Sequence, residues 1–237
     1  MGDQGGRRQS GPRCIALVGP FQSGKTTLLE ALLERNGSIQ RMGSVETGTT
    51  VSDSSAEAHQ FKMSVEAAFA TTTFMGDSYT FVDCPGSVDF LHEMRNVIPA
   101  VDAAVVVCEA DEKKIPALAV IMRELEDLGI PRILFINKID KADKRIRETL
   151  QVLRPASRVP LLLRQIPIWT NGIVSGFVDL ALERAFVYRE HAPSEMVPLG
   201  GEDLDREKEA RFTMLETLAD HDDELMETLL SDLEPPK

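Results

Sequence analysis

The sequence has few cysteines and no long hydrophobic run, and both shortages exclude classes of protein. Its longest purely apolar runs, of which Ala103–Cys108 is one, are far shorter than the roughly 20 residues that a membrane-spanning helix requires, so we expect a soluble protein without a membrane partner. The three cysteines show no metal-ligand spacing, and each lies in or beside an apolar strand-like run: Cys14, Cys84 and Cys108. We therefore expect reduced thiols in the core of a cytoplasmic protein.

Basic residues are also scarce, because 26 Lys or Arg stand against 38 Asp or Glu and the net charge is −12. The excess is mostly local, since residues 202–237 hold thirteen Asp or Glu and four Lys or Arg. Proteins that bind bare nucleic acid neutralise its phosphates with cationic side chains. The composition therefore argues against direct binding to DNA, and any nucleic-acid partner has to be reached in another way.

Short apolar runs alternate with amphipathic stretches over the first part of the chain. This alternation predicts an α/β fold with a mainly parallel sheet, whose central strands are buried on both faces. The predicted strands lie at residues 14–18, 103–108 and 133–136, with helices at 25–35 and 116–128. An antiparallel hairpin is expected from the runs at 65–74 and 79–82, and the polar stretch 43–62 is typical of a long functional loop.

The pattern changes beyond residue 151 to short strand-like pieces at 165–169 and 174–180. The acidic stretch that follows contains two apolar stripes at helical spacing, so we expect two amphipathic helices with a break near Asp222. Such stripes usually pack into a core, and a partner-binding face is the alternative. Residues 1–13 have no apolar segment of the kind found in secretory signals, and we expect a disordered leader there.

The segment between the first predicted strand and helix fits the pattern G-x-x-x-x-G-K-[ST], which is typical of a phosphate-binding loop. Its backbone N–H groups can cradle phosphates, and the following helix begins with a favourable dipole. Lys25 is positioned to reach the β- and γ-phosphates and support catalysis, and the Thr26 hydroxyl can ligate Mg²⁺. The candidate nucleotide-binding residues are Gly19, Pro20, Phe21, Gln22, Ser23, Gly24, Lys25, Thr26 and the adjoining Thr27.

Two further segments follow predicted strands in the order that a nucleotide-binding protein requires. Asp83 ends one strand and is a candidate Mg²⁺ ligand, while the N–H of Gly86 can meet the γ-phosphate. Asn137, Lys138 and Asp140 end another strand, where Asn137 would steady the loops and the Lys138 stem would cover the base.

Base identity depends on Asp140, because its carboxylate can accept hydrogen bonds from N1–H and the N2 amino group of guanine. Adenine offers no such donor pair, so an adenine nucleotide would leave the carboxylate unpaired. GTP or GDP is therefore favoured as cofactor, together with Mg²⁺. An ATP-using enzyme such as a small-molecule kinase is an alternative that rests on the phosphate loop alone.

These motifs, together with residues 43–45, Asp53 and the string 83–90, resemble the GTPase domain of translation elongation factor G. Segments 165–168, 176–180 and 222–227 resemble the subdomain that this family inserts into its GTPase domain. The resemblance implies a three-layer P-loop GTPase fold over residues 14–155 and a small α+β inserted subdomain over 156–237. It also implies a monomeric paralogue that binds the ribosome at its GTPase centre and stalk.

The resemblance further implies that the chain is truncated at its C-terminal end. The family's last nucleotide motif is a Ser-Ala pair in a loop after the insert, and no credible match precedes Lys237. Ala156-Ser157 has the reverse order and the wrong place. We expect residues 1–237 alone to bind nucleotide more weakly than a chain that continues through this loop.

Two positions depart from the family pattern. Ser64 stands where the family has a metal-binding Thr and keeps the hydroxyl, so it is a candidate Mg²⁺ ligand. Ser87 stands where the family has a His that positions the attacking water, and it is the candidate catalytic residue at that place. His92 is nearby in the sequence, but a solvated helix His is the simpler interpretation. A GTPase that acts in a ribosomal step such as translocation is the leading hypothesis, and a GTP-dependent binding switch with little hydrolysis is the alternative.

Overall fold

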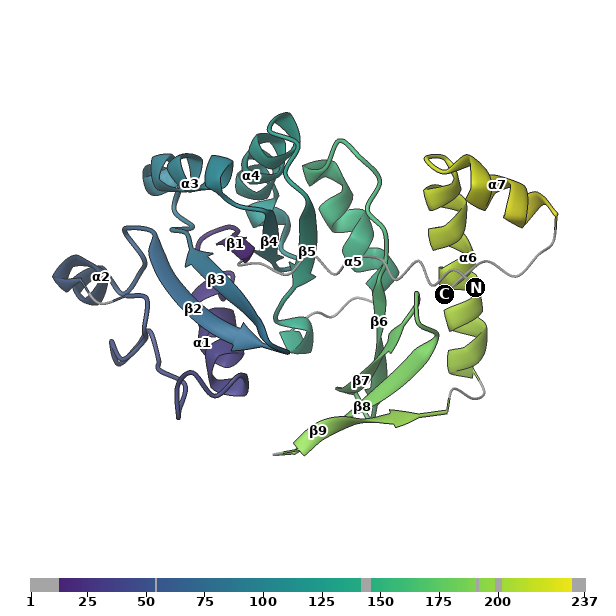
Figure 1. Ribbon diagram of the computed structural model, residues 1–237, viewed down its shortest axis with the longest axis horizontal. Helices are drawn as coiled ribbons and strands as arrows, with labels where there is room; N and C mark the ends of the chain where they lie inside the picture. Colours follow the sequence, from purple (N-terminus) through teal and green to yellow (C-terminus); the bar gives the residue numbers. More distant parts are fainter. Residues whose placement is uncertain (1–12, 54, 142–145, 191, 199–201, 232–237) are drawn as a thin grey trace, which may run out of the picture. The chain divides into compact units, whose positions relative to one another are not determined.

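The computed structural model describes residues 13–231 apart from 54, 142–145, 191 and 199–201, and it divides into two compact units, residues 1–137 and 138–237 (Figure 1). None of the helices in the described part of the chain is long and apolar enough to cross a bilayer. All three cysteines are free, and Cys84 and Cys108 are buried. The predicted leader lies outside the described residues except for Arg13, which instead begins the first strand.

The first unit is an α/β structure built on a five-stranded sheet in the order β2-β3-β1-β4-β5. The pairs β1/β3, β1/β4 and β4/β5 are parallel, and only the hairpin β2/β3 is antiparallel, which confirms the predicted fold class. Its strands are β1 (Arg13–Val18), β2 (Ala68–Phe74), β3 (Asp77–Asp83), β4 (Ala103–Cys108) and β5 (Arg132–Ile136). Its α-helices are α1 (Lys25–Arg35), α2 (Ala56–Phe61), α3 (Leu91–Val97) and α4 (Ile115–Asp127), with 3₁₀ turns η1 (Val88–Phe90), η2 (Ile98–Ala100) and η3 (Glu112–Lys114).

Helix α1 covers one face of this sheet, and α3 and α4 lie together on the other (Figure 1). Leu29 and Leu33 of α1 pack against Leu17 and Phe81, while Val106, whose side chain alternates to the opposite face, is also fully buried. Edge strand β5 departs from the expectation of burial on both faces. Its side chains alternate between half-buried and exposed, so one face of this edge strand is partly covered and the other is open to solvent.

The polar stretch 43–62 is less irregular than expected, because it contains the short helix α2. The Ser55 hydroxyl caps this helix by accepting a hydrogen bond from the Ala58 N–H at 3.2 Å.

Arg13, which was expected in the leader, has defined contacts: its guanidinium bonds to Asp77 and lies over the Tyr79 ring at 5.2 Å from the centroid. The contacts of Arg13 join residues far apart in the sequence, so no local sequence pattern predicts them.

The second unit is a four-stranded antiparallel sheet in the order β6-β7-β8-β9, packed with helices. Its elements are η4 (Ile139–Lys141), α5 (Ile146–Leu153), η5 (Arg154–Ala156), β6 (Gln165–Thr170), β7 (Ile173–Asp179), β8 (Arg184–Arg189), β9 (Ala192–Val197), α6 (Glu202–Ala219) and α7 (Asp223–Leu230). The chain breaks between α6 and α7 near Asp222, as predicted. Asp222 caps α7, because its Oδ1 accepts hydrogen bonds from the N–H groups of Glu224 and Leu225. Strands β8 and β9 and helix α5 are additional to the predicted elements.

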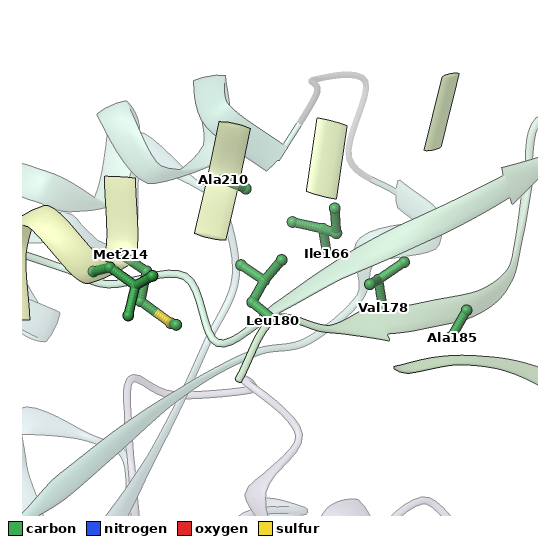
Figure 2. Packing of buried hydrophobic residues seen from close by; sticks show 7 residues of the cluster. Ile166, Val178, Leu180, Ala185, Ala210 and Met214 are labelled. Carbon is green, nitrogen blue, oxygen red and sulfur yellow. The ribbon is translucent and has the colours of Figure 1, made fainter. Parts of the chain in front are cut away.

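The core of the second unit lies between the sheet and α6 (Figure 2). Val178 and Leu180 are fully buried there against Ala210 and Met214 of α6. The expected core role of the two apolar stripes holds only in part: Leu215 and Ala219 are buried and Leu225 and Leu229 partly so, whereas Phe212, Leu218 and Leu230 are exposed. Ile146 of α5 packs on the same cluster, and α5 therefore belongs to the second unit by contact. The boundary expected from the family resemblance, between a GTP-binding domain that ends at residue 155 and an inserted subdomain that begins at 156, stays a prediction.

Candidate nucleotide and metal site

Residues 19–24 form the turn that connects β1 to α1, and Lys25 and Thr26 begin the helix, as the motif predicts. Ser23 N–H donates to Pro20 O at 3.2 Å within this turn, and Phe21 and Gln22 are exposed on it. Gly24 precedes α1 with φ 97°, and a Cβ there would lie 2.3 Å from Nδ2 of Asn137. Only glycine permits both this backbone conformation and this close approach. Thr27 is exposed in the first turn of α1.

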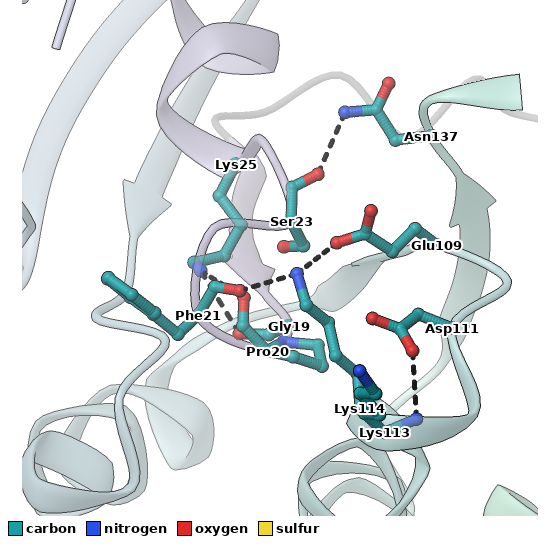
Figure 3. A network of polar contacts seen from close by, with 10 residues as sticks. All are labelled: Gly19, Pro20, Phe21, Ser23, Lys25, Glu109, Asp111, Lys113, Lys114 and Asn137. Atoms are coloured by element: carbon teal, nitrogen blue, oxygen red, sulfur yellow. Dashed lines mark hydrogen bonds and ion pairs between the residues drawn. The ribbon is translucent and has the colours of Figure 1, made fainter. Parts of the chain in front are cut away.

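Lys25 points back along the phosphate loop. Its Nζ donates to the carbonyl of Gly19 at 3.1 Å and to that of Pro20 at 3.2 Å (Figure 3). Burial lowers the pKa of its ammonium, and the nearby Asp83 carboxylate opposes that shift. The side chain is thus held in place, with its charge beside the loop whose N–H groups would carry the phosphates.

The three candidate metal ligands lie together, although they come from distant parts of the sequence. The Thr26 hydroxyl donates to Oδ2 of Asp83 at 2.7 Å, and the Thr26 and Ser64 hydroxyl oxygens are 3.4 Å apart. Helix α1, the end of β3 and the loop before β2 therefore meet at one place, as a metal-binding role of these residues requires.

Asp83 is fully buried, and this burial raises the pKa of its carboxyl to about 6, against the opposing effects of the Thr26 hydrogen bond and the Lys25 charge. The neighbouring Asp53 carboxylate adds to the increase. Within the described residues, Asp83 Oδ1 and Asp53 Oδ2 are buried and accept no hydrogen bond. Carboxylate and hydroxyl oxygens are the hard ligands that Mg²⁺ prefers, so the residues present fit this ion.

Gly86 lies against the phosphate loop. A Cβ at this position would be 2.3 Å from Lys25 Nζ and 2.8 Å from the carbonyl oxygens of Gly19 and Pro20, so no larger residue fits. The next residue, Ser87, caps η1: its hydroxyl donates to Asp89 Oδ2 at 3.0 Å and accepts from the Asp89 N–H at 3.4 Å. The single hydroxyl proton of Ser87 is therefore directed at Asp89.

His92 is on α3 with its imidazole 64% exposed, and it pairs with Glu93 at 3.3 Å. This arrangement is that of a solvated helix His, as the sequence suggests. The described contacts of His92 do not involve Ser87 or the phosphate loop.

Asn137 steadies the phosphate loop by donating from Nδ2 to the Ser23 carbonyl at 2.9 Å. Its own N–H donates to Cys108 O at 2.7 Å, which anchors it to the end of β4. Lys138 follows in the left-handed region at φ 54°, and Asp140 is exposed in η4; both fall in the second compact unit. Their assignment to the guanine base stays a prediction from the sequence.

Two residues near the site were missed from the sequence. Glu30 is buried on α1, where its two carboxylate oxygens accept from the N–H groups of Gly43 at 2.7 Å and Val51 at 2.6 Å. The sequence contains a pattern that could have identified Glu30: it is four residues after Thr26 and therefore lies on the same face of the helix. Lys114 contacts the phosphate loop from η3, and its position in a pair of lysines carries no such signal.

The chain matches known proteins over almost its whole length. A family model described as the elongation factor Tu GTP binding domain matches residues 11–229. An elongation factor G-like protein of Synechocystis sp. is 42% identical over 225 residues, which are 95% of this chain and 34% of that protein. A crystal structure of a protein from Thermus thermophilus has a TM-score of 0.82 and 33% identity, covering 94% of this chain and 33% of that one. The chain thus spans about a third of the length of these relatives.

Proposed function

The chain belongs to the family of the elongation factor Tu GTP-binding domain, and from this we propose that it is the guanine-nucleotide-binding part of a translation factor resembling elongation factor G. The factor couples GTP binding and hydrolysis to a ribosomal step such as translocation. It acts in the cytoplasm as a monomer that contacts the ribosomal GTPase centre and stalk. The structural observation that supports nucleotide and Mg²⁺ binding is the hydrogen bond between Thr26 and Asp83, which joins the phosphate loop to the end of β3, while the family match supports the guanine nucleotide.

The residues of the candidate site would each contribute differently to nucleotide binding. The loop 19–26 presents backbone N–H groups to the phosphates, and Lys25 adds a positive charge beside them. Thr26, Ser64 and Asp83 would hold Mg²⁺, which neutralises phosphate charge when bound. Gly86 is close enough to Lys25 for its N–H to respond to a γ-phosphate. Asp140 would select guanine.

A binding switch with little hydrolysis is the second candidate function, and the geometry of Ser87 favours it. The hydroxyl proton is directed at Asp89, and a serine side chain is too short to position an attacking water as a His does. The factor would then occupy the ribosome in its GTP state and leave slowly. Hydrolysis depends on water orientation in this class of enzyme, so loss of the positioning residue separates binding from turnover.

Ribosome-stimulated GTP hydrolysis of the complete protein and its Ser87→His variant distinguishes the two candidates. If the protein is a binding switch, Ser87→His raises the rate by about 10²-fold or more, the range contributed by a well-placed general acid or base. Rapid native hydrolysis that Ser87→His does not raise would contradict the binding switch. Ser87→Ala is the matched control and tests the serine hydroxyl itself, while His92→Ala excludes a contribution from α3.

Base selectivity is tested by titrating the complete protein with fluorescent GDP, GTP and ATP. We expect a strong preference for guanine nucleotides that Asp140→Ala abolishes, because the acceptor for N1–H and the N2 amino group is removed. The control is Asp127→Ala at the end of α4, which removes an equal charge in the first unit. Equal affinity for ATP and GTP in the native protein would contradict the guanine assignment.

A further inference from the structure

Lys114 is a second lysine at the phosphate loop. It ends η3, just before α4, and its Nζ donates to the carbonyl oxygen of Phe21 at 3.0 Å (Figure 3). The same ammonium pairs with the Glu109 carboxylate, and its side chain is only 25% exposed. The described contacts therefore fix Lys114 between an acid of its own segment and the backbone of the loop.

This contact controls the direction of one peptide unit. A trans peptide is planar, so its C=O and N–H groups point in opposite directions. Holding the Phe21 carbonyl toward Lys114 therefore turns the Gln22 N–H away from it. Gln22 has φ 56°, a left-handed conformation that is unfavourable for a residue with a Cβ. A charge-assisted hydrogen bond of the kind that Lys114 makes is strong enough to maintain it.

The ion pair with Glu109 weakens the long-range attraction of the Lys114 charge for a phosphate anion. An ammonium neutralised by an adjacent carboxylate attracts a distant anion weakly, whereas its directed bond to Phe21 remains. Lys113, the preceding residue, has the same charge but an exposed side chain, and its N–H caps η3 through Asp111. The two lysines thus differ in contact with the loop rather than in charge.

We propose that Lys114 is a positioning residue for nucleotide binding, which keeps the Gln22 N–H turned toward the bound phosphates by holding the Phe21 carbonyl. The proposal rests on the proposed guanine-nucleotide function. Because the loop serves the phosphates common to both nucleotides, Lys114 supports GDP and GTP equally. Its effect appears in affinity and dissociation rate rather than in the choice of base.

The test compares GDP and GTP dissociation constants and dissociation rates of the complete protein with those of Lys114→Met. We expect Lys114→Met to weaken both nucleotides by about tenfold, mainly through faster dissociation, which is the usual size of the loss of one charged hydrogen bond. Lys113→Met is the matched control and stays within about twofold of the native protein. Lys114→Arg keeps a charged donor and restores most of the affinity.

A double variant separates the lost contact from the freed charge of Glu109. If Lys114→Met acted by leaving Glu109 to repel phosphate, adding Glu109→Gln would restore native affinity and overturn the proposal. Equal losses in Lys113→Met and Lys114→Met, or native affinity in Lys114→Met, would overturn it too. Absence of guanine-nucleotide binding in the native protein would instead refute the proposed function, so the two failures are distinguishable.

Discussion

Burial of Asp83, which we propose as a Mg²⁺ ligand, carries a cost to stability, and Asp83→Asn exposes this cost. The carboxyl is fully buried, and its pKa is raised from 3.8 to about 6. At about 1.4 kcal/mol per pH unit, ionising the buried group at neutral pH costs the folded state about 3 kcal/mol. Asparagine is uncharged and can still accept the Thr26 hydrogen bond. Asp83→Asn should therefore stabilise the metal-free, nucleotide-free protein at pH 7.5 by up to about 3 kcal/mol.

The pH dependence has a definite sign. Because the folded-state pKa lies above the unfolded value of 3.8, the contribution of Asp83 to stability is fully present below about pH 4 and is lost as pH rises through about 6. The advantage of Asp83→Asn is thus expected to be near zero at pH 4 and to grow to its full size by pH 7. Mg²⁺ with GDP should reverse the order, since only the native carboxylate supplies a charged ligand.

Urea unfolding at a series of pH values, in a chelator, measures this difference. Circular dichroism follows the whole chain, while the single tryptophan, Trp169 in β6, reports on the second unit. The control is Asp220→Asn, which removes an exposed carboxylate and should change stability little at any pH. A variant that is less stable than the native protein at pH 7.5, or an advantage that does not change between pH 4 and 7, would refute the reasoning.

Two further predictions follow from close contacts of the site. Gly86→Ala places a Cβ 2.3 Å from Lys25 Nζ and 2.8 Å from two loop carbonyls, so GTP affinity should fall about tenfold, measured by fluorescent-nucleotide titration. Unchanged GTP affinity would show that the 83–87 segment does not lie on the loop. Glu30→Gln replaces one carboxylate oxygen with a donor, so the Gly43 and Val51 amides should exchange with deuterium about 10- to 100-fold faster. Native exchange at both amides would contradict the anchoring role of Glu30.

The fold was predictable where local patterns are strong. Helix α1 begins and ends at the predicted residues, and β4 has the predicted bounds, because each combines a continuous periodic pattern with a clear start or stop signal. The resemblance to elongation factor G is confirmed by the family match and by the 42% identity. Strands β8 and β9 were missed, since β9 is exposed along most of its length and lacks the alternation that marks a half-buried strand.

The site was predictable only in part, for a related reason. Thr26 and Asp83 lie in motifs whose chemistry requires these residue types, and Ser64 is placed by the family resemblance. The structure brings the three side chains together, and their role as metal ligands stays a prediction. The contacts of Glu30 with Gly43 and Val51 use backbone groups of the loop, which any sequence supplies. A hydrogen bond to a backbone N–H or C=O restricts the residue type of the side-chain partner only, so the sequence shows at most one of the two partners.

The sequence by itself determined the fold class and indicated the ligand class, because the phosphate-loop motif, the carboxylate predicted to select guanine and the strand–helix alternation are each local patterns of neighbouring residues. Only the tertiary structure decided how these parts support one another. Burial of Asp83 raises its pKa, Lys114 reaches the carbonyl of Phe21, and Ser87 turns its proton toward Asp89. Burial and the direction of a side chain depend on the packing of distant segments, which residue spacing does not encode.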